Sequence, residues 1–424
     1  MNIVVLKYGG SSQTLDTYNL IYERMKIKSN KHIIVLSAIK GITNKLIDFI
    51  STKNFNIWTE VLIQNNNFSI NCINEKTSFN VAMENKLWDL EKDKIEIIAM
   101  GEFFTTHILN NFLQKKGIKS KFLSSFDIIK SNQKNIGFYN KGEFVANSEI
   151  LLNEFKNNDV LIVPGFSGVS IDNEPCLLGR GGSDTTGSII ASSINAKCYE
   201  IWTDVDGIYS SDPRFIKNTK IINYINYNAA QEIAAMGAKV IHPYSILPCM
   251  NNKIPILIKN SFNPDSLNLT TIGNYIKIKD DIYAITIQND IKVFKITSQN
   301  MWNNFGFVFD IFSIFKKYNV DINIINTSQF NITTTTDDCH IENLLEIKNE
   351  LSKQYEVELI IDNSIVSVIS QEIRKYKNIG KIFEIAQNYN IILTSYSSND
   401  MTLSWVINSN KSIDFAQNLH NYIF

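Results

Sequence analysis

The opening of the chain carries residues that could hold a phosphate group. In Lys7–Ser12 (KYGGSS), the two glycines let the backbone approach a phosphate closely and point N–H groups at its oxygens. Lys7 could balance the phosphate charge, and Ser11 could donate its hydroxyl. The lysine precedes the glycines, whereas a Walker A loop places it after them, so an ordinary strand and turn remains the alternative.

A second glycine-rich segment, Leu178–Gly187 (LGRGGSDTTG), precedes an apolar, helix-like run. A helix that starts after such a loop binds anions through its free N–H groups and its dipole. Arg180 could grip a carboxylate or phosphate with two parallel hydrogen bonds. The structural alternative is that Ser183 or Asp184 simply caps the helix.

Two further segments suit a nucleotide. In Glu200–Arg214 (EIWTDVDGIYSSDPR) a strand is expected to end at Thr203-Asp204, and the loop that follows offers an aromatic ring, carboxylates and a basic residue. In Met236–Pro243 (MGAKVIHP), Lys239 is a candidate second cation for phosphate charge. His242 is interpreted mainly as a packed or turn histidine, because the five histidines show no metal-ligand spacing.

Strands and helices must alternate to bring these segments together. Short Val/Ile/Leu runs are typical of strands buried on both faces of a parallel sheet, and they occur at Ile3–Leu6, His32–Ala38, Val160–Phe166 and Ile254–Ile258. Helical spacing of apolar residues lies between them, as in Thr105–Lys116 and Ser183–Asn195. This alternation predicts an α/β fold with helices on both faces, and ligands bind beyond the carboxyl ends of such strands.

The C-terminal third of the chain contains a repeat. Lys295–Gln299 (KITSQ) recurs as Ser367–Gln371 (SVISQ), and Asp310–Val320 recurs as Lys381–Ile391. We therefore predict two copies of a strand–loop–helix–strand unit, and a domain boundary near residue 280, after a polar segment with turn-forming residues.

The bulk composition excludes several classes of protein. A chain of 424 residues with a net charge of −1 gives no global signal for nucleic acid or an anionic membrane. The five cysteines form no C-x-x-C pair, which argues against a disulfide framework or zinc site and suits a reducing compartment. No signal peptide or membrane span is expected, so the predicted location is the cytoplasm.

Six segments in this order resemble the aspartate kinases of the amino-acid kinase superfamily. Besides KYGGSS, GRGGSD, WTDVDGIYSSDPR and GAKVIHP, they are Ser37–Asn44 (SAIKGITN) and Met100–Thr105 (MGEFFT), the latter expected at a helix start. The resemblance extends to the C-terminus, because the duplicated tail is similar to the paired ACT modules of these enzymes. It implies a three-layer α/β/α catalytic domain with a mainly parallel sheet over 1–280, and two ferredoxin-like ACT modules over 281–424.

The resemblance also implies a reaction and a site. The reaction is transfer of the γ-phosphoryl group of ATP, carried with Mg²⁺, to the side-chain carboxylate of L-aspartate, the first step towards lysine, threonine and methionine. No protein metal site is expected. The catalytic residues implied are Lys7, Asp184 and Lys239. Substrate contacts are implied for Thr43, Glu102, Arg180 and Ser183, and nucleotide contacts for Lys7, Gly9, Gly10, Ser11, Thr203, Asp204, Tyr209, Arg214, Lys239 and Val240.

The resemblance further implies a homodimer formed through the ACT modules and an amino-acid effector site in the first of them. The effector residues would be Met301, Asn304, Gly306, Val308, Asn323, Thr327 and Ser328. Asn304 replaces a serine of the lysine-sensitive members, and Asn323 and Gln329 replace acidic residues. Losing two carboxylates would weaken the grip on a lysine ammonium group, so weak or absent inhibition by lysine is expected.

One departure lies beside the predicted catalytic aspartate. Members of the family usually carry an aromatic and then a small residue after Ser183-Asp184, whereas this chain has Thr185-Thr186-Gly187. A glycine inside a helix costs about 1 kcal/mol relative to alanine, which predicts a loosened loop.

Three alternative functions fit the sequence less well than an aspartate kinase does. A sister kinase acting on acetylglutamate, glutamate, carbamate or UMP is the nearest, and the Thr43, Glu102 and Arg180 segments favour aspartate over it. A catalytically dead amino-acid sensor is disfavoured by the intact Lys7, Asp184 and Lys239. A bifunctional kinase–dehydrogenase is not expected, because no G-x-G-x-x-G fingerprint follows the second tail module.

Overall fold

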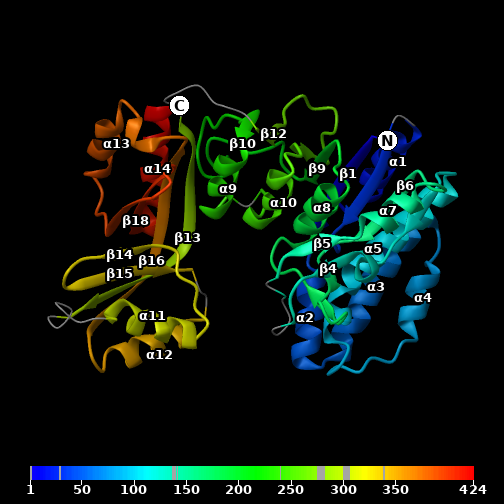
Figure 1. Ribbon diagram of the computed structural model, residues 1–424, viewed down its shortest axis with the longest axis horizontal. Helices are drawn as coiled ribbons and strands as arrows, with labels where there is room; N and C mark the ends of the chain where they lie inside the picture. Colours follow the sequence, from blue (N-terminus) through cyan, green and yellow to red (C-terminus); the bar gives the residue numbers. More distant parts are fainter. Residues whose placement is uncertain are drawn as a thin grey trace. The chain divides into compact units, whose positions relative to one another are not determined.

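The computed structural model describes residues 2–27, 30–135, 140, 142–238, 240–274, 282–298, 306–337 and 340–424. Lys239, Met301 and Asn304 lie outside the described residues, as does the boundary predicted near residue 280. The chain divides into two compact units, each described here by itself (Figure 1). The first comprises Met1–Ile208, Ile221–Gln231 and Lys239–Ile276, and the second comprises Tyr209–Lys220, Glu232–Ala238 and Lys277–Phe424.

An eight-stranded sheet forms the centre of the first unit. Its strands, in spatial order, are β10 (Tyr224–Asn226), β12 (Thr270–Gly273), β11 (Ile256–Asn260), β9 (Cys198–Thr203), β1 (Ile3–Tyr8), β2 (Lys31–Leu36), β6 (Val160–Pro164) and β3 (Ser120–Phe122). All neighbouring pairs are parallel except β11 with β12. Every residue of β1 and β6 is buried, which confirms the prediction of strands covered on both faces.

Helices cover both faces of this sheet, so the predicted three-layer α/β/α architecture is confirmed. On one face, α1 (Leu15–Lys26) and α5 (Lys94–Lys115) pack against alternate residues of β1, including Val4 and Leu6. On the other face, α8 (Gly182–Ser193) packs against β1, β2 and β9. The side chains of each strand alternate between the two faces, which explains why one short apolar run supplies both layers.

The remaining elements of the first unit surround this framework. A second sheet, of four short strands, has the order β5 (Phe144–Ala146), β4 (Ile129–Ser131), β7 (Ser167–Val169) and β8 (Pro175–Leu177), and the sequence analysis did not anticipate it. The other helical elements are η1 (Gly10–Ser12), α2 (Ile42–Thr52), α3 (Phe55–Ile73), α4 (Ser78–Glu84), α6 (Ser125–Ile128), α7 (Ser148–Glu154), η2 (Pro243–Ser245) and α10 (Leu247–Asn251); α9 (Tyr227–Ala235) belongs to both units. Among the helices of the described residues, none is long and apolar enough to cross a membrane.

The second unit is built on one antiparallel sheet. Its strands, in spatial order, are β14 (Ile325–Thr327), β15 (Asn331–Thr336), β13 (Ile282–Thr297), β16 (Glu356–Ser370), β18 (Thr402–Asn408) and β17 (Leu393–Tyr396). Helices α11 (Phe307–Lys317) and α12 (Ile341–Leu351) enclose one apolar core, and α13 (Ile379–Ala386) and α14 (Ser409–Ile423) enclose another; η4 (Ile373–Lys375) precedes α13. This arrangement confirms the prediction of two ferredoxin-like modules.

The two modules share their longest strands. The second half of β13 pairs with the first half of β16, as in Phe294 opposite Leu359. The first half of β13 pairs with the second half of β16, as in Ile285 opposite Val368. Register shifts between Gln288 and Val293 separate the two halves. Each module therefore takes half of each long strand.

A short segment from the middle of the sequence is also part of the second unit. In Tyr209–Lys220, the side chain of Ile216 is buried in the core enclosed by α13 and α14. The Ser210 carbonyl accepts a 2.8 Å hydrogen bond from the N–H of Ile285, and its hydroxyl lies 2.9 Å from Nε2 of His420. This segment, which contains the predicted nucleotide residues Tyr209 and Arg214, is thus anchored in the second unit.

Candidate active site

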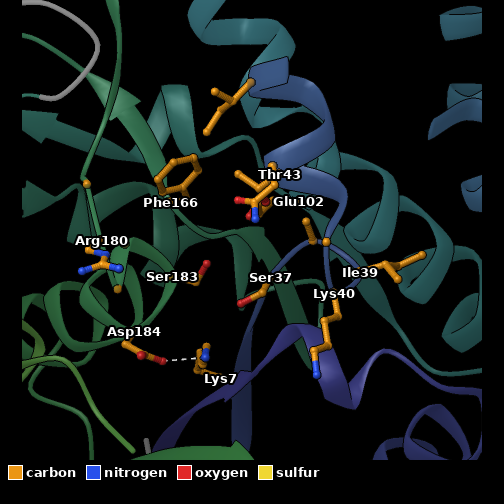
Figure 2. Close-up of a pocket in the computed structure, with 17 residues that line it drawn as sticks. Lys7, Ser37, Ile39, Lys40, Thr43, Glu102, Phe166, Arg180, Ser183 and Asp184 are labelled. Carbon is orange, nitrogen blue, oxygen red and sulfur yellow. Dashed lines mark ion pairs between the residues drawn. The ribbon is translucent and has the colours of Figure 1, made fainter. Parts of the chain in front are cut away.

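A pocket of about 380 Å³ lies at the carboxyl ends of β1, β2 and β6 in the first unit (Figure 2). This is where parallel α/β sheets bind ligands. The pocket brings together the predicted residues Lys7, Thr43, Glu102, Arg180, Ser183 and Asp184. Residues from distant parts of the sequence therefore converge on one site.

Lys7 and Asp184 form an ion pair on one wall of this pocket. The Nζ atom of Lys7 lies 2.6 Å from Oδ1 of Asp184, and both side chains are mostly shielded from solvent (Figure 2). Lys7 is held by β1, which lies in the middle of the parallel sheet, and Asp184 is held by the first turn of α8. Shielding from water strengthens the field that such a pair exerts on a bound anion.

The start of α8 is shaped by a glycine rather than by a capping side chain. The N-cap residue is Gly181, with φ of +67°, and no side chain caps the helix. The alternative that Ser183 or Asp184 serves as the cap is therefore wrong. A Cβ atom on Gly181 would lie 2.3 Å from Cβ of His242, so this close approach requires glycine. His242 packs here, in agreement with its interpretation as a packed residue, and burial lowers its pKa.

A second helix N-terminus opens into the same pocket. Helix α2 also begins after a glycine with positive φ, Gly41, and also lacks a capping side chain. The loop before it touches the glycine turn after β1, because the carbonyl of Gly10 accepts a 3.2 Å hydrogen bond from the N–H of Lys40. A Cβ atom on Gly10 would lie 2.7 Å from the carbonyl oxygen of Ala38, so a side chain does not fit there. Two uncapped helix starts leave N–H groups for anions.

Glu102 is the buried acid of the site. Only 3% of its surface is exposed, and its Oε2 atom has no hydrogen-bond partner among the described residues. Burial raises the pKa of its carboxyl to about 8, although the N–H of Ala38 and the charge of Lys7 act in the opposite direction. The expectation that the Gly101-Glu102 segment starts a helix is wrong, because α5 begins at Lys94. Glu102 thus lies about two turns inside a long, rigid helix.

Arg180 and Thr43 supply further polar groups. Arg180 lies in the loop before α8, and its guanidinium makes no hydrogen bond or ion pair with the part of the chain that the structure describes. Thr43 lies in the first turn of α2 and lines the same pocket as Glu102 (Figure 2). A guanidinium without an ion pair suits a carboxylate, and a buried carboxylate with one oxygen left without a hydrogen bond suits an ammonium group.

The glycine turn after β1 lies next to the end of a neighbouring strand of the sheet. The N–H of Gly9 donates a 3.2 Å hydrogen bond to the carbonyl of Trp202, which places the glycine turn next to the end of β9. Thr203 ends that strand and its hydroxyl lies 3.2 Å from Oδ1 of Asp204. The hydroxyls of Ser12 and Ser261 are 2.7 Å apart and fully buried, so they fasten the turn to the segment after β11.

Other predicted residues do not line the pocket. Gly9, Gly10, Ser11, Thr203, Asp204 and Val240 belong to the first unit but are absent from its lining. Tyr209 and Arg214 belong to the second unit, where Arg214 pairs with Asp212 at 2.6 Å. The role of all these residues in nucleotide binding stays a prediction.

The described effector residues flank α11 and β14 in the second unit. Gly306 is the N-cap of α11 and Val308 lies in its first turn, half exposed. Asn323 donates its N–H to the carbonyl of Thr335 at 2.8 Å; Thr327 ends the exposed strand β14, and Ser328 follows it. Their role in binding an effector stays a prediction.

Several pocket residues were not singled out from the sequence. These are Ser37, Lys40, Asn44 and Phe166. The first three lie in the segment SAIKGITN, so their position at or just after the end of a predicted strand was the available signal. Phe166 follows β6 in the same way, and its φ of +72° is rare for an aromatic residue. The described residues contain no cluster of three or more His, Cys, Asp or Glu side chains that could hold a metal ion.

The fold and the site together define a class of protein. A mainly parallel sheet, with anion-binding helix starts and a Lys–Asp pair at the carboxyl ends of its strands, is the framework of a small-molecule phosphotransferase. Residues 2–260 match the model of the amino acid kinase family. The chain belongs to this family.

Known proteins are similar over the whole chain. Lysine-sensitive aspartokinase 3 of Escherichia coli is 27% identical, and the match covers 100% of this chain and 99% of that protein. Chloroplastic aspartokinase 2 of Arabidopsis thaliana is 24% identical, covering 99% and 84%. The solved structure of E. coli aspartokinase III with aspartate and ADP has a TM-score of 0.81 at 24% identity and covers both chains fully. Clostridium acetobutylicum aspartate kinase has a TM-score of 0.80 at 24% identity, covering 99% and 100%.

Proposed function

We propose that this protein transfers the γ-phosphoryl group of ATP to the side-chain carboxylate of L-aspartate. One observation carries the proposal: a single pocket combines two uncapped helix N-termini, a guanidinium and a buried carboxylate, and among the described residues the guanidinium forms no ion pair and one carboxylate oxygen has no hydrogen-bond partner. Aspartate has two carboxylates, which suit the helix N-termini and the guanidinium, and one ammonium group, which suits the buried carboxylate. The similarity to aspartokinases over the full chain supports the same assignment.

Each group of the substrate has a partner in this proposal. Arg180 binds the α-carboxylate, because its guanidinium makes no hydrogen bond or ion pair with the described residues and can form two parallel hydrogen bonds. Glu102 binds the ammonium group, which would supply the partner that its buried Oε2 atom lacks. Thr43 and Ser183, in the first turns of α2 and α8, add hydrogen bonds.

The chemistry then needs no general base. The side-chain carboxylate of aspartate is already ionised at neutral pH. One of its oxygens forms the new bond to the γ-phosphorus, and the bond from that phosphorus to the β–γ bridging oxygen breaks, so ADP leaves with both bonding electrons. Lys7, held by Asp184 at 2.6 Å, neutralises the charge that spreads over the transferred group. Lys239 is the proposed second cation.

ATP is the proposed phosphoryl donor, and Mg²⁺ would accompany it. When bound with ATP, the metal would neutralise part of the phosphate charge. Asp184 is the carboxylate beside the predicted phosphate position, so it is the residue that would face the metal's hydration shell. The turn Gly9-Gly10-Ser11 would hold phosphate oxygens through its N–H groups.

An acceptor panel tests the proposal. ADP release is measured with ATP and Mg²⁺ in the presence of aspartate, glutamate, acetylglutamate, carbamate or UMP. Aspartate should support turnover far better than the other acceptors, since acetylglutamate, carbamate and UMP lack the ammonium group that Glu102 would bind. Turnover with any of those three, and none with aspartate, would show that the assignment is wrong.

A substitution at Lys7 tests the catalytic role. Lys7→Ala should abolish aspartate-dependent ADP release while the protein remains folded. Lys31→Ala is a matched control, because Lys31 lies in the neighbouring strand β2 and forms a comparable 2.7 Å ion pair with Asp159 outside the pocket. The control should keep its turnover. Near-normal turnover of Lys7→Ala would refute the assignment.

We also propose a homodimer, formed through the edge of the sheet in the second unit. Strand β14 is an edge strand whose residues are all exposed, and Ile325 on it is 48% exposed. An exposed apolar edge is a template for pairing with another chain. An amino-acid effector at the modules is part of the same proposal. A cytoplasmic location is supported by the free thiols of the described cysteines.

A further inference from the structure

Helix α8 contains a glycine in its interior where the sequence predicts a loosened loop. The helix nevertheless continues without a break from Gly182 to Ser193. Gly187 lies against the ring of Tyr199, which projects from the neighbouring strand β9 and is fully buried. A methyl group on Gly187 would lie 2.5 Å from the Tyr199 hydroxyl oxygen and 2.6 Å from its Cε2 atom. The missing side chain therefore makes room for this tyrosine.

The ring that fills this space also reaches the catalytic segment. The hydroxyl of Tyr199 donates a 2.8 Å hydrogen bond to the main-chain carbonyl of Asp184. The carboxylate of the same residue holds Lys7 at 2.6 Å. Because burial raises the pKa of Tyr199 well above its usual value, the hydroxyl keeps its proton and stays a donor at every working pH.

The surroundings of Asp184 show why an added hydrogen bond matters. The N-cap residue of helix α8 is Gly181, and no side chain caps the helix, so no capping hydrogen bond fixes its first turn. The Thr185 hydroxyl bonds back to the carbonyl of Gly181 at 3.1 Å and so serves the first turn only. Tyr199 is fixed in the central sheet, where it pairs in register with Val5 of β1, the strand that also carries Lys7. Strand β1 therefore carries Lys7, and its neighbour β9 carries the tyrosine that bonds to the main chain of Asp184.

We propose that Gly187 and Tyr199 form a matched pair that positions Asp184, and through it Lys7, for phosphoryl transfer. Tyr199 is a positioning residue that touches no substrate, and Gly187 is its complement. The expected change in kcat rests on the proposed function, whereas the expected change in melting temperature does not. It also explains how this chain keeps an ordered helix despite the glycine.

Removing only the hydroxyl is the first test. Tyr199→Phe should lower kcat about tenfold, since a small misplacement of a catalytic group has effects of this size or larger, and should leave both KM values within about twofold. Tyr227→Phe is the matched control, because Tyr227 is also buried and also donates to a main-chain carbonyl, that of Ile254, at 2.7 Å. The control should lose a similar amount of thermal stability and keep its kcat. Equal kcat in the two variants would overturn the proposal.

The second test uses opposing expectations for Gly187→Ala. Helix propensity alone predicts a more stable protein, since alanine is the better helix former. The matched pair predicts a lower melting temperature and a lower kcat, because the new methyl group displaces Tyr199. Adding Tyr199→Val removes the ring, so the double variant should be more stable than Gly187→Ala and have the kcat of Tyr199→Val. A stabilised, fully active Gly187→Ala single variant would overturn the proposal.

The outcomes separate this inference from the proposed function. If Gly187→Ala fails to fold, Tyr199→Phe still decides the kinetic question. If the wild-type protein does not use aspartate, the proposed function fails, and the non-additive melting temperatures of the Gly187 and Tyr199 variants still test the pairing. Additive melting temperatures would show that the two residues are not coupled, whatever the substrate.

Discussion

Replacing Glu102 by glutamine should change how substrate capture depends on pH. The pKa of the buried Glu102 carboxyl is about 8 in the ligand-free protein. The carboxyl is therefore about one-tenth ionised at pH 7 and about nine-tenths ionised at pH 9. If only the ionised form binds the substrate ammonium group, kcat/KM for aspartate should rise about tenfold between these pH values, since this quantity reports ionisations of the free enzyme.

Steady-state assays of ADP release across this pH range test the reasoning. Glu102→Gln should have a much lower kcat/KM for aspartate and should lose the rise with pH. Comparing the two proteins also controls for ionisation of the substrate, because the ammonium group of aspartate titrates identically in the wild-type and variant assays. A wild-type kcat/KM that is flat between pH 7 and 9, or a variant with the same slope, would refute the role of Glu102.

The same carboxyl predicts an effect on folding stability of the opposite sign. The folded protein holds the proton of this carboxyl more tightly than the unfolded chain does, because the pKa is raised on folding. The free energy of unfolding therefore falls as pH rises from 4.5 towards 8. At pH 7 the cost amounts to about 3 kcal/mol. Glu102→Gln should therefore be more resistant to urea than the wild type at pH 7 and should not differ at pH 4. Equal resistance at both pH values would show that the raised pKa is wrong.

Three further predictions concern the glycine turn and the second unit. Gly10→Ala should abolish turnover and lower the free energy of unfolding in urea by about 1–3 kcal/mol, because its Cβ would lie 2.7 Å from the Ala38 carbonyl oxygen. The control is Gly380→Ala, where the new Cβ has no atom within 4 Å, and it should be slightly stabilising in the same titration. Lysine should inhibit ADP release weakly or not at all, and inhibition at micromolar lysine would contradict the reading of Asn323. Ile325→Lys should shift the mass measured by light scattering from dimer to monomer, and an unchanged mass would place the interface elsewhere.

The sequence predicted the layers of the first unit better than the geometry of its site. Continuous apolar runs such as Ile3–Leu6 identify strands covered on both faces, because no polar residue could be tolerated there. The four-stranded second sheet was missed, since strands of three residues carry no measurable alternation. The resemblance put the segment Met100–Thr105 at the start of a helix, whereas α5 begins at Lys94.

Contacts between distant segments were also beyond reach. Tyr199 and Gly187 are separated by eleven other residues, and nothing in either residue alone shows that one fills the space left by the other. The anchoring of Ile216 in the C-terminal core is similar, because the segment reads as one continuous motif with Thr203 and Asp204. Only the tertiary fold reveals which neighbour each side chain meets.

The sharing of β13 and β16 between the two modules has a consequence for biosynthesis. The first half of β13 precedes the first module in the sequence, whereas the strand it pairs with, the second half of β16, follows that module. The ribosome therefore synthesises the two halves of this pair on either side of the first module. The first module is thus nested within the second, which cannot close until the chain has reached β16 and β18. Because long-range strand pairing is slow, we expect the nested module to fold first on the ribosome. A fragment of residues 289–362 should fold alone, and one starting at residue 364 should not, as judged by circular dichroism.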